Sequence, residues 1–219
     1  MDGLICIIAA MDIEFSAIIE SFGIKSLGDG LDSRFRIGVC ENKRVIVAHS
    51  GVGKAKAEAC AEAIYAKYDS INGFISAGMA GAVVPNLNIG EIVIGDAVFE
   101  EMQGLYEKVY ETKRSVIKST AKRNIRIGPV FCSDGFFSDA ERKIRLHEST
   151  GALCVEMESA GIARFALKNG IPFVSVKAIS DHADGKALRL ILRSYKETCE
   201  GLAIYLSETV ENIFWETER

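Results

Sequence analysis

The sequence has few of the features that mark metal, disulfide, nucleic-acid or membrane proteins. Its three histidines are far apart and show no ligand spacing, so we expect no metal site. Its six cysteines include no C-x-x-C pair, which indicates reduced thiols in the core rather than a disulfide framework. The formal net charge is -4 and the Lys and Arg residues are scattered, so the chain lacks the electrostatic footprint of a nucleic-acid-binding protein.

Long apolar runs are also missing. None reaches the roughly 18 to 20 residues of a membrane span, so we expect no membrane partner. The first run, residues 4–10, is too short for a signal peptide and lacks its basic flank, which makes the cytoplasm the expected location. Repeats, low-complexity tracts and linkers are absent as well. With 48% hydrophobic residues, the chain is expected to fold as a single domain over residues 1–219.

Strand-like and helix-like segments alternate along the chain, which is typical of an α/β protein. Strands are expected at 4–10, 34–40, 44–49, 73–77, 91–99, 128–132, 152–155 and 172–180. Helices are expected at 12–22, 54–68, 138–149, 159–169, 188–213 and in the later half of 100–126, and a glycine-punctuated loop is expected after residue 77. The predicted fold is a twisted mixed sheet flanked by helices.

Three carboxylates follow strand-like runs. Glu14 follows residues 4–10, Glu158 follows 152–155 and Asp181 follows 172–180. Because the carboxyl ends of parallel strands meet at one crevice, these acids can converge on one ligand. Singly, two of them have a simpler explanation: the acids of 156–158 suit a helix N-terminus, and Asp181 suits a turn or cap. Together they favour acid/base chemistry on a polar small molecule.

Glycines and aromatics supply three further candidates. The segment 51–54, Gly-Val-Gly-Lys, turns a strand into a helix, where free N–H groups can hold an anion or a hydroxyl; a tight packing turn is the alternative. The small residues of 76–82 allow a ligand close to the main chain, or simply form a sharp turn. Phe136 and Phe137 either fill the core or offer a stacking platform for a ring.

The joint order of these segments carries more information than any one of them. Segments 10–14, 50–54, 78–81 with 89–93, 133–136, 155–158 and 178–184 resemble the 5′-methylthioadenosine/S-adenosylhomocysteine nucleosidases of the purine nucleoside phosphorylase superfamily, over nearly the whole chain. The resemblance implies a three-layer α/β/α sandwich around a mixed sheet, a homodimer, and neither metal nor organic cofactor. The apolar residues Val83, Val84 and Leu87 are compatible with a dimer contact.

The resemblance also implies a role for each site residue. Glu14 would activate the attacking water, and Asp181 would protonate purine N7. Glu158 would accept hydrogen bonds from the ribose hydroxyls. The other implied substrate-binding positions are Met157 under the sugar, Phe136 stacked on the base, Phe137 reading the base edge through its main chain, and Met11, Val52, Met79, Glu156 and Lys177.

This division of roles fits the chemistry of N-glycosidic cleavage. The reaction passes through an oxocarbenium-like ribosyl group, so it needs an acid for the leaving base, an anion near the developing cation and a base for water. The expected activity is hydrolysis of methylthioadenosine or S-adenosylhomocysteine to adenine and the thioribose product. Phosphorolysis is the near alternative, although the acidic segment 11–14 would repel a phosphate dianion.

Two further functions stay open. One is that of a nucleosidase for a nucleoside with a different 5′ group, since the segment 100–126 is shorter than in typical members. The second is that of a catalytically silent nucleoside-binding protein. It is motivated by Met79 and Lys177, which stand where the family commonly has serine and arginine. Retention of all three acids argues against it.

Overall fold

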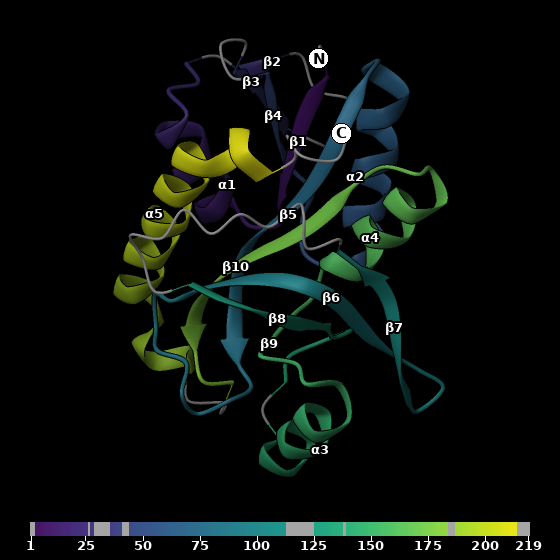
Figure 1. Cartoon of the computed structure of the whole chain (residues 1–219). Coiled ribbons are helices and arrows are strands. Elements are labelled where there is room, and N and C mark those ends of the chain that lie inside the picture. The colour runs from purple at the N-terminus through teal and green to yellow at the C-terminus, as the bar shows by residue number, and fades with distance from the viewer. Residues whose placement is uncertain are drawn as a thin grey trace.

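The computed structural model describes residues 3–25, 27–28, 36–40, 44–112, 125–137, 139–183 and 187–213. It shows a mixed sheet with helices on both faces (Figure 1). The strands are β1 (Leu4–Ala9), β2 (Leu27–Gly28), β3 (Arg36–Cys40), β4 (Val45–His49), β5 (Ile71–Ala82), β6 (Ile92–Met102), β7 (Leu105–Glu111), β8 (Ile125–Cys132), β9 (Cys154–Glu156) and β10 (Phe173–Asp181). The helices are α1 (Asp12–Ser21), α2 (Lys54–Lys67), α3 (Ala140–Thr150), α4 (Ser159–Lys168) and α5 (Ala187–Ile213).

The sheet folds back on itself. Its strand order is β10-β6-β8-β9-β5-β1-β4-β3-β2, and β10 also pairs with β5, so β5, β10, β6, β8 and β9 form a closed ring. On one side of the ring, β5, β1 and β4 continue as a parallel sheet. Within the ring, β10 is parallel to β5 and antiparallel to β6, and β9 is antiparallel to β5. Ring closure brings β9, which ends at Glu156, next to the carboxyl end of β5.

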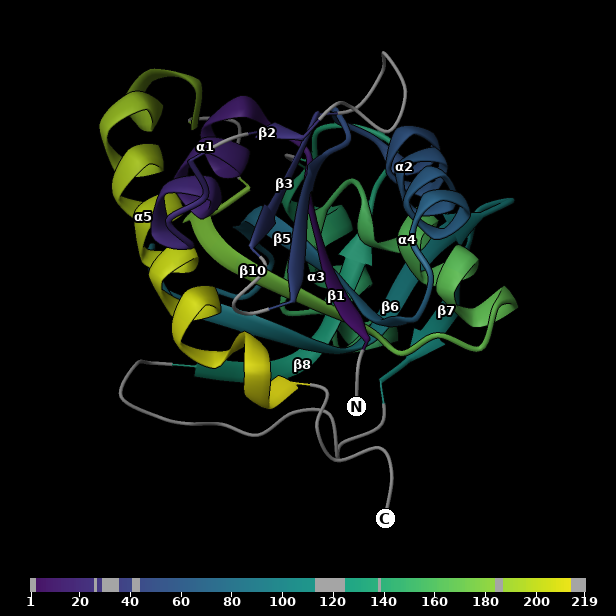
Figure 2. The same cartoon turned by 90° about the horizontal axis from the view of Figure 1, so that it is seen from above.

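Helices cover the two faces in pairs. Figure 2 shows α1 with α5 on one side and α2 with α4 on the other. Phe15 and Ile18 of α1 pack in one buried cluster with Leu202 and Leu206 of α5. The opposite cluster contains Ile64 of α2 and side chains of α4. Burial of these two apolar faces explains why the chain adopts three layers, since each amphipathic helix has a sheet face to cover.

Two segments differ from the sequence-based expectation. Residues 78–82, expected in a loop, are the second half of β5, because they pair with β10 from Gly78 to Gly81. The first half of 100–126 is a β-hairpin of β6 and β7, and its two-residue turn, Gln103 and Gly104, has positive φ angles at both positions. That turn geometry matches the twist of paired strands. The helix expected in the later half of 100–126 falls mostly on residues outside those described.

Most smaller features follow the expectation. All six cysteines are free, and all but Cys40 are buried. The helix stop at Asn169-Gly170 is present, with Gly170 at a φ of 68°. Helix α3 begins at Ala140, after an N-cap at Asp139 that accepts a hydrogen bond from Arg142 N. That start lies two residues beyond the expected Ser138, because an aspartate satisfies the free N–H groups of the first turn.

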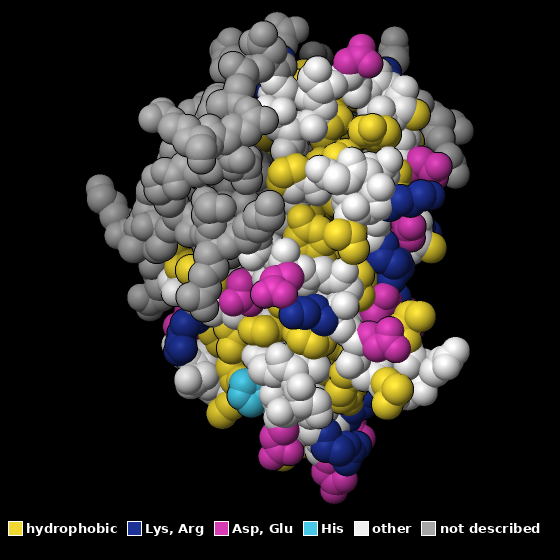
Figure 3. Space-filling model, turned by 45° about the vertical axis from the view of Figure 1, so that its right-hand side comes forward, with side chains coloured by type: hydrophobic (Ala, Val, Ile, Leu, Met, Phe, Trp, Pro, Cys, Tyr) yellow, Lys and Arg dark blue, Asp and Glu magenta, His cyan; other side chains and the backbone are white. Residues whose placement is uncertain are grey.

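The surface carries both charge signs. On the face drawn in Figure 3, Asp and Glu side chains are interspersed with Lys and Arg. Among the described helices, none is both long and apolar enough to cross a membrane.

The contact between α2 and α4 depends on a glycine. A Cβ atom at Gly161 would lie 2.1 Å from the carbonyl oxygen of Lys54 and 2.9 Å from its carbonyl carbon. We expect Gly161→Ala to lower the free energy of unfolding by about 1–3 kcal/mol, because the helices must move apart. Urea denaturation measures this. Gly135→Ala is the control, since no described atom lies within 4 Å of its Cβ position. Equal midpoints for the two variants would contradict the close contact.

Candidate active site

Glu14 is a buried carboxylate held by the main chain. It lies in the first turn of α1, directly after β1, with 3% of its surface exposed. Its Oε2 accepts hydrogen bonds from Met11 N at 2.9 Å and Ala10 N at 3.2 Å, and its Oε1 accepts one from Met79 N at 2.8 Å. Burial raises the pKa of Glu14, although these N–H groups and the charge of Lys177 lower it. A carboxylate with a raised pKa and a fixed position suits a general base.

The replacement at Met79 affects Glu14 less than its side chain suggests. The contact with Glu14 comes from the main-chain N–H of Met79, which any residue except proline supplies. The neighbouring position, Gly78, requires glycine, because a Cβ atom there would lie 2.7 Å from Glu14 Oε1. The group that approaches the main chain of 76–82 here is the Glu14 side chain, and approach of a ligand stays a prediction.

Glu158 is held by the glycine turn before α2. It is the N-cap residue of α4, and its Oε1 accepts a hydrogen bond from Gly53 N at 2.9 Å. Gly53 has a φ of 109°, which favours glycine. Burial, reinforced by the charge of Glu156, raises the pKa of Glu158 to about 7, against the lowering effect of Lys177. The N–H of this turn therefore binds a carboxyl group of the chain itself, and binding of a ligand there stays a prediction.

Glu156 and Lys177 form a buried ion pair beneath these acids. Lys177 Nζ lies 2.9 Å from Glu156 Oε2, and 1% of the Lys177 side chain is exposed. Burial alone would raise the pKa of Glu156, but Lys177 and the N–H groups of Ser159 and Glu158 outweigh it and hold that pKa below its usual value. Burial lowers the pKa of Lys177, yet Glu156 and Glu158 raise it overall. Sequence reasoning placed both residues against the substrate; the structure places their charged groups against each other.

Asp181 ends β10 opposite Gly81 of β5. Its Oδ1 accepts a hydrogen bond from Ala183 N, and its Oδ2 accepts one from Ser180 Oγ, both at 2.7 Å. A Cβ atom at Gly81 would lie 3.1 Å from Asp181 Oδ1, so glycine leaves room for this carboxyl group. The local turn that sequence reasoning offered as the alternative is present, because the carboxylate caps the residues after the strand.

Tyr195 of α5 is a neighbour that sequence reasoning missed. Burial raises its pKa, the charges of Asp181 and Glu14 raise it further, and a hydrogen bond with Ser180 lowers it. Its hydroxyl therefore lies within electrostatic reach of both expected catalytic acids. No motif includes this residue, and a tyrosine in an amphipathic helix is too common to single it out from the sequence.

Glu14 and Glu158 lie close together, and Asp181 ends a strand at the same edge of the sheet as Glu14, only partly for the expected reason. Strands β1, β5 and β10 are parallel, so Glu14 and Asp181 follow carboxyl ends at one edge of the sheet. Glu158 follows β9, which is antiparallel to β5 with Val155 opposite Gly81. It reaches the site because the ring of strands closes. Glu14 and Glu158 are close enough that the charge of one raises the pKa of the other.

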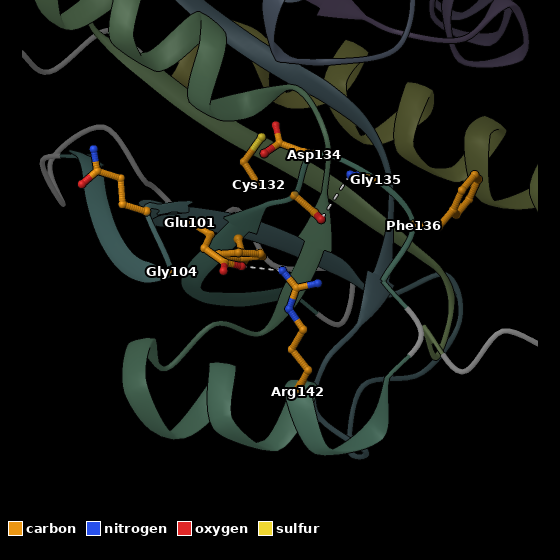
Figure 4. A pocket seen from close by; sticks show the side chains of 10 residues that line it. Glu101, Gly104, Cys132, Asp134, Gly135, Phe136 and Arg142 are labelled. Carbon is orange, nitrogen blue, oxygen red and sulfur yellow. Dashed lines mark hydrogen bonds and ion pairs between the residues drawn. The ribbon is translucent and has the colours of Figure 1, made fainter.

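The aromatic pair after Ser133 has one buried and one exposed member. Phe137 is buried, in edge contact with Phe131, and the guanidinium of Arg142 lies 4.4 Å from its ring centroid. Phe136 is 93% exposed and points away from the adjacent groove (Figure 4). The loop is tied to α2 by the ion pair of Lys54 Nζ with Asp134 Oδ1 at 2.7 Å. Phe137 thus fills the core, and stacking of a base on the exposed Phe136 stays a prediction.

The groove beside this loop is a separate feature from the acids. It has a volume of about 380 Å³ and lies between the loop 131–136, the β6–β7 turn and Arg142 (Figure 4). Arg142 pairs there with Glu101. Its lining includes neither Glu14, Glu158 nor Asp181. Of the remaining expected contact residues, Val52 is 44% exposed, and Met11 and Met157 are partly exposed.

The raised pKa of Glu158 predicts a pH dependence of stability. A carboxyl group whose pKa rises on folding stabilises the protein fully below its unfolded pKa, and this contribution is lost as pH rises through the folded value of about 7. Glu158→Gln removes that loss. We expect the stability of this variant relative to the wild type to increase between about pH 5 and 8, by at most about 1.4 kcal/mol per pH unit. Urea denaturation across this range tests it; the exposed Glu62→Gln is the control, and a flat difference contradicts it.

Comparison with known proteins places the chain in a family. A family model of the phosphorylase superfamily matches residues 4–211, and the chain belongs to that superfamily. A 5′-methylthioadenosine/S-adenosylhomocysteine nucleosidase of Staphylococcus aureus is 26% identical over 232 residues, covering 95% of this chain and 97% of that protein.

Solved structures agree with this placement. The corresponding Helicobacter pylori nucleosidase with butyl-thio-DADMe-Immucillin-A has a TM-score of 0.83 at 25% identity, covering 95% of this chain and 98% of that one. The Streptococcus pyogenes S-adenosylhomocysteine nucleosidase with 5-methylthiotubericidin has a TM-score of 0.82 at 26% identity, covering 97% and 98%. The expected nucleoside phosphorylase-like fold, a mixed sheet with helices on both faces, is confirmed.

Proposed function

We propose that this protein hydrolyses the N-glycosidic bond of 5′-methylthioadenosine or S-adenosylhomocysteine, releasing adenine and the thioribose product. The observation that carries the proposal is Glu14, a buried carboxylate fixed by three main-chain N–H groups at the strand edge where Asp181 also lies. Binding alone does not need a base at that position. The similarity to nucleosidases over 95% of the chain supports the same activity.

The proposed mechanism divides the work among the acids. Glu14 takes a proton from the attacking water, and Asp181 protonates N7 so that adenine leaves as a neutral base. Glu158, as a carboxylate, accepts hydrogen bonds from the two ribose hydroxyls and stabilises the developing positive charge. Met157 packs under the sugar, and Phe136 stacks on the base. The main chain of Phe137 reads the edge of the base, while Met11, Val52 and Met79 line the substrate.

Water is a better-supported nucleophile than phosphate. Lys177, the cation whose charge reaches Glu14, Glu156 and Glu158, is already bound by Glu156 and Ser76. A phosphate dianion brought beside Glu14 would meet three carboxylates around a single occupied ammonium group, and that repulsion disfavours its binding. The site therefore favours hydrolysis over phosphorolysis.

The first experiment is an assay of base release. Purified protein is incubated with methylthioadenosine, S-adenosylhomocysteine, adenosine and inosine, each with and without phosphate, and free base is followed by chromatography. We expect adenine from the 5′-thio nucleosides without phosphate. Release that requires phosphate would assign a phosphorylase instead. Release from other 5′ groups only would assign a different nucleosidase, and binding without release would assign a silent nucleoside-binding protein.

We further propose that the protein works in the cytoplasm as a homodimer. Val83, Val84 and Leu87 are buried within the chain, so they do not offer a dimer contact. The homodimer is proposed on the resemblance to the 5′-methylthioadenosine/S-adenosylhomocysteine nucleosidases. Sedimentation equilibrium is expected to give twice the chain mass. A single-chain mass would exclude the dimer without affecting the proposed activity.

A further inference from the structure

Lys177 is almost fully buried among the described residues. It lies in the middle of β10, between Gly78 of β5 and Val93 of β6, and is 1% exposed. Its Nζ donates a hydrogen bond to Ser76 Oγ at 2.9 Å and pairs with Glu156 Oε2 at 2.9 Å. Both of these partners belong to the protein. An ammonium group held in this way fixes the positions of the side chains that it binds, Ser76 and Glu156.

The partner of Lys177 holds the backbone of the ribose-binding segment. Glu156 Oε2 accepts hydrogen bonds from Ser159 N at 2.9 Å and Glu158 N at 3.1 Å, and Oε1 accepts one from Ser159 N at 3.1 Å. These are the N–H groups at the start of α4, where a carboxylate also meets the positive end of the helix dipole. Glu156 therefore fixes the main-chain position from which the Glu158 side chain extends to Gly53.

The charges around this pair are unbalanced. Glu14, Glu156 and Glu158 all act on Lys177, so three carboxylates share one buried cation. The thiols of Cys132 and Cys154 also border the group, and burial raises the pKa of each, so they stay neutral at pH 7. Removing the ammonium group would leave Glu156 buried without a counter-ion, which is costly. Lys177 thus supplies the positive charge that acts on Glu14, Glu156 and Glu158.

We propose that Lys177 is a positioning residue, which holds Glu156 as a carboxylate against the start of α4 and so fixes the place and charge of Glu158. This role rests on the proposed function, because it assigns to Glu158 the ribose hydroxyls. It differs from a direct contact between Lys177 and the substrate or water, the role that the resemblance implies. The two roles predict different behaviour when Glu156 is changed at the same time.

A double-mutant cycle separates them. We expect Lys177→Met to lower kcat/KM by about 10- to 100-fold, the range typical of lost supporting contacts. If Lys177 acts through Glu156, the double variant Lys177→Met, Glu156→Gln loses no more than Lys177→Met alone, because the unpaired charge is removed. If Lys177 contacts the substrate directly, the two losses multiply. Lys177→Arg, which keeps the charge, is expected to retain more activity than Lys177→Met.

The pH profile supplies a readout that a purely structural role would not move. Glu158 is faced by Glu156, Lys177, Glu14 and the N–H of Gly53. Its ionisation should set the acid limb of kcat/KM. We expect this limb to shift to higher pH in Lys177→Met, to lower pH in Glu156→Gln, and to return near the wild-type position in the double variant. Acid limbs at the same pH in all three variants would overturn the proposal.

Two further outcomes are decisive. Should Lys177→Met not fold, Glu156→Gln is compared with the double variant: equal kcat/KM supports the role, and a further loss overturns it.

Wild-type turnover is measured first. Absence of both turnover and methylthioadenosine binding would refute the proposed function and this role with it. Binding without turnover would refute hydrolysis alone, and the same cycle is then read in the Kd for methylthioadenosine.

Discussion

Glu14→Gln is expected to lower the rate of adenine release by about 10²- to 10⁴-fold, the usual contribution of a positioned proton transfer. Glutamine is nearly the same size but cannot take a proton from water. Its amide nitrogen must also face one of the main-chain N–H donors that now bind the two carboxylate oxygens. The rate is followed by chromatography of adenine under single-turnover conditions, so that chemistry rather than product release is measured.

The affinity of Glu14→Gln for methylthioadenosine decides how its loss of rate is interpreted. We expect Glu14→Gln to bind methylthioadenosine with a Kd within a few-fold of the wild type, because Glu158 and the aromatic loop make the proposed contacts with the sugar and base. Glu20→Gln, an exposed change on the same helix, is the matched control and should turn over normally. Wild-type turnover in Glu14→Gln would remove Glu14 as the base. A comparable loss in Glu20→Gln would indicate damage to α1 instead.

Asp181→Asn is expected to reduce adenine release by a similar factor, but to spare substrates with a good leaving group. Adenine departs readily only when N7 is protonated, whereas 4-nitrophenolate leaves a riboside without help from an acid. Asparagine can still accept the hydrogen bond from Ala183 N, so the local turn is kept. The ratio of the two rates therefore isolates proton donation from structural damage.

The measurement compares release of adenine with release of 4-nitrophenolate in the wild type, Asp181→Asn and the exposed control Asp69→Asn. We expect Asp181→Asn to lose about 10²–10⁴-fold with adenine and less than about tenfold with 4-nitrophenolate. Equal losses on both substrates would show that Asp181 positions the sugar or the strand end rather than donating the proton. No loss with either substrate would show that another residue protonates N7.

The sequence alone determined most of the elements and the identities of the acids, but neither β2, β7 nor the second half of β5. Alternating strand and helix periodicity follows from which side chains must be buried, so β1, β10 and all five helices were predicted close to their observed bounds. Glu14 and Asp181 were predicted to meet because parallel strands place their carboxyl ends at one edge. The residue types themselves favoured acid/base chemistry on a polar small molecule.

Tertiary structure decided how those acids are held and charged. The sequence contains no sign that β10 pairs with both β5 and β6, because pairing over long distances depends on the packing of the whole sheet. That closure places Lys177 beside Glu156, although the family resemblance implied a substrate contact for this residue. The same closure brings Gly53 to Glu158. A pKa depends on burial and on neighbouring charges in space, so the value near 7 for Glu158 was decided by the folded chain.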